Sequence, residues 1–145
     1  MSCGSVYNTI YRRICEMEII DTHEHLPARE ENYRFGADIL QEYLKHYYIF
    51  DLLSAGMPEQ YVESINDTEM FVRDKWKLIA PYCSMTWNTG YAKCLRYAAK
   101  GLYGIDDINE DSIEELNRAY RNSQNAGFYR RMLRDRCSIQ KACLD

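Results

Sequence analysis

The sequence predicts an α/β chain that is mostly α-helical and contains one or two short strands. Segment 17–25 has two adjacent isoleucines, the residue pattern of a strand buried on both faces, and Pro27 closes it because proline cannot extend a β-ladder. Most of the chain beyond residue 36 spaces its apolar residues at helical intervals. The final segment, 138–145, predicts a second and weaker strand.

The first half of the chain gives its elements in a clear order. A helix is expected over residues 4–16, before the strand, and the polar stretch 28–35 is expected to be a loop. Ala37–Tyr47 carries apolar residues at i, i+3 and i+4 and predicts one amphipathic helix. Pro58 suits the first turn of the next helix, where its missing N–H costs nothing.

In the second half of the chain, capping residues and glycines mark the expected ends of the helices. Asp67 or Thr68 is expected to cap a helix that Pro81 kinks or ends. Thr89 is expected to start another helix, which stops near Gly101 and Gly104. The residues expected to face inward on it are Cys94, Leu95, Ala98 and Leu102.

Two further helices precede the final strand. Asn109 followed by acidic residues predicts a capped helix start, because carboxylates favour the positive end of the helix dipole. Ala126–Cys137 predicts one more amphipathic helix, whose arginines form a solvated face.

These elements predict a single incomplete domain over residues 1–145. Residues 1–27 form a leading helix and first strand, 28–125 a helical insertion, and 126–145 a helix and second strand. Two strands are too few for a self-sufficient parallel sheet, which needs cover on both faces. We therefore expect a truncated chain with exposed apolar surface on both strands and on the final helix.

Composition excludes several classes of function. The net charge of −4 and pI of about 5.4 argue against nucleic-acid binding, which needs a basic face. No run of roughly 18 apolar residues predicts a membrane span, and the first residues do not resemble a signal peptide. None of the six cysteines forms a C-x-x-C pair, so the simplest expectation is a reduced, cytoplasmic protein.

The segment Asp21-Thr22-His23-Glu24-His25 carries the chemistry. In a strand, residues i and i+2 project from one face, so His23 and His25 are expected to point together and bind one divalent metal. Asp21 is a candidate to orient the His23 imidazole as a carboxylate that does not itself bind the metal. The alternative is two solvated loop histidines ahead of Pro27.

With its flanking residues, Ile19–Leu26 resembles the first barrel strand of the amidohydrolase superfamily, whose pattern is apolar-apolar-Asp-x-His-x-His. The resemblance implies the N-terminal fragment of a metal-dependent (β/α)₈ TIM barrel, with His23 and His25 as metal ligands. It implies a divalent metal, zinc first with Mn, Fe or Ni as alternatives, and a metal-activated water that attacks a small polar substrate. The other ligands would come from later strands, so the chain alone is expected to be inactive.

A narrower resemblance is to uronate isomerases, which carry a long helical insertion after the first strand. The stretches that carry it are His46-Tyr47…Gly56-Met57, Gly104–Glu110, Glu114–Asn117 and 139–145 as barrel strand two. The resemblance makes His46 and Tyr47 candidates for substrate binding. Phe50 stands where those enzymes have an arginine, which argues against a uronate substrate.

Two alternatives without catalytic function stay open. His46 and Tyr47 can be ordinary helix residues, with Tyr47 on the apolar stripe. The whole chain can also be a non-enzymatic helical interaction module, in which amphipathic helices and the 13 tyrosines form a partner surface.

Overall fold

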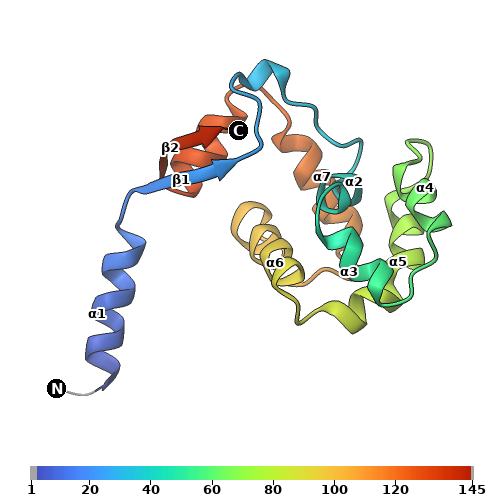
Figure 1. The fold of residues 1–145 in the computed structure, drawn as a ribbon, viewed down its shortest axis with the longest axis horizontal. Helices are drawn as coiled ribbons and strands as arrows, with labels where there is room; N and C mark the ends of the chain where they lie inside the picture. The colour runs from blue at the N-terminus through green and yellow to red at the C-terminus, as the bar shows by residue number, and fades with distance from the viewer. Residues whose placement is uncertain (1–2, 145) are drawn as a thin grey trace. The chain divides into compact units, whose positions relative to one another are not determined.

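The computed structural model describes residues 3–144, with the Cys3 side chain left out, and divides into two compact units. The strand unit is formed by residues 3–33 and 126–144, and the helical unit by Arg34–Asn125 (Figure 1). The chain is mostly helical with a two-stranded parallel sheet, as the sequence predicts. Among the described residues, no helix is long and apolar enough to cross a membrane.

The strand unit contains the sheet and three short helical elements. They are α1 (Cys3–Cys15), β1 (Ile19–Glu24), the 3₁₀ helix η1 (Glu30–Asn32), the π-helix η2 (Arg130–Arg136) and β2 (Ile139–Leu144). Strands β1 and β2 lie side by side and parallel, from Ile19 opposite Ile139 to Glu24 opposite Leu144 (Figure 1). The register is irregular after Ile19 and again between Asp21 and Glu24.

The strand faces are open to solvent in this chain. Ile19 and Ile20 are 47% and 61% exposed, and Leu144 is also exposed, as expected for strands without cover. The same expectation fails for the final helix, where Met132 and Leu133 are half-buried. The apolar residues of α1 are instead the more exposed ones: Val6, Tyr7, Ile10, Tyr11 and Ile14.

The segment before β2 is wider than the expected α-helix. Hydrogen bonding over Arg130–Arg136 follows the π pattern, which inserts an extra residue into each turn. Cys137 ends it, and Ser138 takes a positive φ of 56° before β2 begins. Sequence spacing alone does not distinguish this π-helix from an α-helix.

The helical unit consists of six helices within the described chain: α2 (Ile39–Leu44), α3 (Tyr48–Ser54), α4 (Gln60–Asn66), α5 (Val72–Thr86), α6 (Gly90–Tyr103) and α7 (Ile113–Ser123) (Figure 1). Its core gathers buried side chains from all six, and the fully buried ones include Ile39, Leu52, Ile79, Ile113 and Leu116. These burials give the unit a hydrophobic core of its own.

The single helix expected over Ala37–Tyr47 is wrong. Asp38 caps α2 by accepting hydrogen bonds from the backbone N–H groups of Leu40 and Gln41. Helix α2 then ends at Leu44, and α3 begins at Tyr48. The break turns Tyr47 off the apolar stripe, leaving it 53% exposed.

The predicted ends of α6 are confirmed, whereas the predicted start of α5 is wrong. Thr89 caps α6 and Gly104 ends it at φ 74°, both as expected. The predicted cap at Asp67 or Thr68 is wrong: α5 begins at Val72, and Asp67 instead closes α4. Its carboxylate accepts from the Glu69 N–H in a local turn, a bond that competes with helix capping.

Helices α5 and α6 each differ from the sequence prediction in one detail. Pro81 lies inside α5 rather than ending it. On α6, Ala92 and Ala99 are the buried positions, Leu95 is half-buried, and Cys94 is exposed, so the inward face is rotated from the one expected.

Candidate metal centre

The two histidines of the H-x-H segment lie together at the end of β1. His23 is in the strand and His25 is one residue beyond its last residue, Glu24. Their ring centroids are 4.7 Å apart, and the ring planes meet at 85°. With zinc–nitrogen bonds near 2.0–2.1 Å, two imidazoles on one ion would have centroids about 5 Å apart, so this separation is compatible with a shared cation. The edge-to-face angle is equally compatible with two rings packed on each other.

The carboxylates of this segment contact its own backbone. Asp21 Oδ1 accepts from the His23 backbone N–H at 3.2 Å, and Glu24 Oε1 accepts from the His25 backbone N–H at 2.8 Å. Asp21 was expected to orient the His23 ring. The bond from the His23 backbone N–H to Asp21 fixes the main chain at His23, and this restricts where the ring can point.

The histidine pair is incomplete as a catalytic metal site. Across residues 3–144, as far as their side chains are described, no three His, Cys, Asp or Glu residues gather closely enough to hold an ion. Catalytic zinc usually has three protein ligands and an open position. The described residues therefore offer two imidazoles of the three protein ligands that such a site uses.

A clasp of hydrogen bonds holds the segment after β1 against the segment before β2. Glu30 Oε1 accepts from the backbone N–H groups of Gly127 and Phe128 at 2.6 and 3.0 Å, and Glu30 Oε2 accepts from Tyr129 N–H at 2.9 Å. The Tyr129 hydroxyl donates to the Pro27 carbonyl at 3.0 Å. These backbone donors, the Tyr129 N–H first, lower the pKa of the Glu30 carboxyl below its usual value.

Sequence analysis missed this clasp. Glu30 stands in a polar stretch expected to be a loop, and its partners are 97 to 99 residues away. Gly127, with a φ of 81°, is the one local sign that the chain turns sharply there. The clasp matters to the histidines because it fixes Pro27, two residues after His25.

The other two candidate residues belong to the helical unit. His46 and Tyr47 lie in the break between α2 and α3, and both are exposed. Tyr47 stacks on Tyr91 of α6, with centroids 5.3 Å apart. Phe50, on α3, is also exposed. These positions give His46 and Tyr47 an open surface rather than an enclosed pocket.

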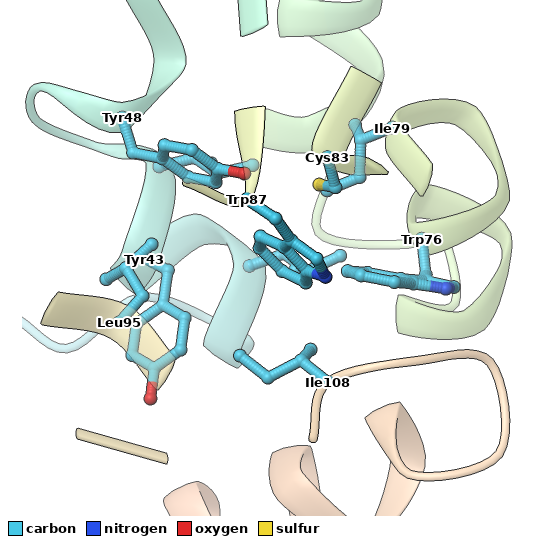
Figure 2. A pocket seen from close by; sticks show the side chains of 10 residues that line it. Tyr43, Tyr48, Trp76, Ile79, Cys83, Trp87, Leu95 and Ile108 are labelled. Atoms are coloured by element: carbon cyan, nitrogen blue, oxygen red, sulfur yellow. The ribbon is translucent and has the colours of Figure 1, made fainter. Parts of the chain in front are cut away.

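The apolar cavity of the helical unit is too small for a substrate. It measures about 10 Å³, roughly the space of one water-sized sphere. Figure 2 shows the Trp87 indole among Tyr48, Trp76 and Ile108. Nearby, the Tyr48 hydroxyl bonds Thr86 Oγ1 at 2.9 Å, and burial raises the pKa of the Cys83 thiol to about 11. This region is packed core.

Comparison with known proteins finds no match to this chain among protein-family models, curated proteins or solved structures.

Proposed function

We propose that this chain is the N-terminal part of a metal-dependent hydrolase of the amidohydrolase superfamily, in which His23 and His25 bind a divalent metal. The observation that carries the proposal is the 4.7 Å separation of the two imidazole rings at the C-terminal end of β1. Barrel enzymes place their chemistry at that end of their strands. The bound metal, zinc in the first instance, would activate a water for attack on a small polar substrate.

The parallel pairing of β1 and β2 supports a barrel origin. Consecutive strands of a (β/α)₈ barrel are parallel neighbours joined by helical crossovers. Here β1 and β2 pair in parallel, and the chain between them is helical. The exposed isoleucines of β1 would then be covered in the intact barrel.

Different residues of this chain would have different roles at the metal site. His23 and His25 would supply two neutral imidazole ligands. Asp21 and Glu24 hold the main chain at these two residues through their backbone bonds. The Glu30 clasp would keep the loop after His25 in place. With two ligands the isolated chain would hold metal weakly and would not turn over substrate.

A second candidate is a sugar-acid isomerase fragment of the uronate-isomerase type. The observation that favours it is the long helical unit between β1 and β2, with His46 and Tyr47 on its open surface. Phe50 in place of an arginine argues against it, because a carboxylate substrate needs a cationic partner. The hydrolase proposal is therefore preferred.

A third candidate, a non-enzymatic helical interaction module, rests on the exposed apolar face of α1. It differs from the other two in assigning no role to the histidine pair. The metal experiment below therefore separates it from both enzyme proposals.

The test is metal binding by the 145-residue chain, measured by titration with Co²⁺ and by competition with Zn²⁺. The sequence has three histidines, which provides a matched control. We expect His23→Ala and His25→Ala each to weaken binding at least tenfold, because removing one of two ligands leaves no chelate. His46→Ala should bind as the unaltered chain does. Equal affinity in all four proteins, or no binding by any, would overturn the proposal.

A further inference from the structure

A basic hollow lies on the surface of α6, within the helical unit. It has a volume of about 280 Å³ and is lined by Lys93, Arg96, Tyr97, Lys100 and Asp106. The four helix residues are spaced i, i+3, i+4 and i+7, so they share one face of α6. Like charges at this spacing weaken a helix, so the arrangement is not one that helix stability favours.

Arg96 is the best-placed cation of the hollow. Its Nε is buried and has no hydrogen-bond partner among the described residues. Its guanidinium carbon lies 5.6 Å from the centre of the Trp87 ring, a cation–π contact that orients the planar group. A buried, unsatisfied donor on a charged group is costly, and an anionic acceptor would remove that cost.

The charges of the hollow do not cancel. Asp106 is the one acidic side chain that lines it, and it pairs with Lys100 at 2.7 Å. The hydrogen bond that Lys100 donates to the Asp106 carboxylate raises the pKa of Lys100, so that ammonium stays protonated. Three cations therefore face one carboxylate, and Lys93 and Arg96 are left to attract an external anion.

We propose that this hollow binds a small phosphorylated molecule, with its phosphoryl group between Arg96 and Lys93. A planar guanidinium can present paired N–H donors to phosphate oxygens, and the lysine adds a mobile point charge. The Tyr97 ring, which also lines the hollow, would contact the rest of the ligand. A long polyanion is disfavoured because the whole chain carries a net charge of −4 and would repel its flanking phosphates.

Binding would be measured by two-dimensional NMR of the 145-residue chain at fixed ionic strength. The probes are inorganic phosphate, glycerol phosphate and, as a competing class, a short DNA duplex. We expect saturable shifts of α6 amides with glycerol phosphate, weaker ones with inorganic phosphate, and none specific to DNA. Tighter binding of the duplex, or shifts spread over every basic helix, would overturn the proposal.

Matched variants test the residues. Arg96→Gln should weaken glycerol phosphate binding at least tenfold, because it removes a charged hydrogen-bond donor. Lys93→Gln should weaken it about threefold. The control is Arg118→Gln, an exposed arginine on α7 with the same change of charge, which should alter binding less than twofold. If Arg96→Gln does not fold, the proposal is tested by Lys93→Gln alone. Lys93 is exposed, so its substitution should not disturb folding. Equal effects of Lys93→Gln and Arg118→Gln would mean general charge attraction and no site.

Discussion

The buried ion pair of the helical unit gives the sharpest prediction about stability. Lys75 Nζ lies 2.6 Å from Asp38 Oδ2, and the Lys75 side chain is 0% exposed. The other oxygen, Asp38 Oδ1, accepts the two backbone bonds that cap α2. Asp38 thus has two structural roles on two different oxygens, and two substitutions can separate them.

Removing the charge of Asp38 leaves a buried lysine without its partner. Breaking a buried pair in this way costs about 3–5 kcal/mol, and loss of a helix cap costs about 1 kcal/mol. Asp38→Asn keeps a capping oxygen and should lose only the first amount. Asp38→Ala should lose both, about 4–6 kcal/mol, a large part of the 5–15 kcal/mol typical of a folded domain. Because both losses act through one carboxylate, their sum is an upper bound.

The assay is urea unfolding of the 145-residue chain, followed by circular dichroism. Asp74→Asn is the matched control, since Asp74 pairs with Lys77 at 3.2 Å on the exposed side of α5 and should cost less than about 1 kcal/mol. The double variant Asp38→Asn/Lys75→Met should recover most of the loss, because an apolar side chain replaces the unpaired ammonium. If Asp38→Asn is no more destabilising than Asp74→Asn, the assignment of a stabilising role to this pair is wrong.

Two further predictions concern a carboxylate and a thiol. The pKa of Glu30 is lowered in the folded chain, so its stabilising effect is present above the unfolded pKa and is lost as pH falls through the folded pKa. Glu30→Gln should therefore destabilise the chain at pH 7, and urea midpoints should converge with those of the unaltered protein at strongly acidic pH; parallel curves would contradict this. Burial raises the pKa of Cys83 from 9.0 to about 11, so at neutral pH its thiolate fraction falls roughly a hundredfold. Mass spectrometry after alkylation should show Cys94, which is exposed, labelled far sooner than Cys83, and equal rates would count against a buried thiol.

The features that sequence predicted well are those encoded by neighbouring residues. Thr89 and Gly104 mark the ends of α6 because a capping hydroxyl and a left-handed glycine act within one turn of the helix. The sequence likewise predicted the strand that carries His23, because Ile19 and Ile20 at its start favour an extended backbone. In each case the physical cause lies within a few residues of its effect.

The features that sequence missed depend on partners far along the chain. Asp38 and Lys75 are 37 positions apart, and nothing near either residue predicts that the lysine is buried. The break between α2 and α3 has the same character: the apolar stripe continues through it, yet the chain turns so that Tyr48 enters the core. Tertiary packing overrode a helical pattern that was locally sound.

The helical unit ties together its own two ends, and this explains how so long a segment can join neighbouring parallel strands. The Tyr120 hydroxyl donates to the Gly36 carbonyl at 3.1 Å, and Arg121 donates to the Ala37 carbonyl at 3.0 Å. The Gln124 amide also donates to Gly36, across 88 positions of sequence.

Since hydrogen bonds hold the first and last segments of the helical unit together, the unit spans only a short distance between the end of β1 and the start of the segment before β2. A disordered crossover would add a closure cost that grows by about 0.6 kcal/mol for each doubling of its length. The folded helical unit avoids that cost through its own core, and the Glu30 clasp joins the two segments of the strand unit that flank it in sequence. We therefore expect substitutions in the hollow on α6 to leave unaltered the β1–β2 register that places His23 near the end of β1.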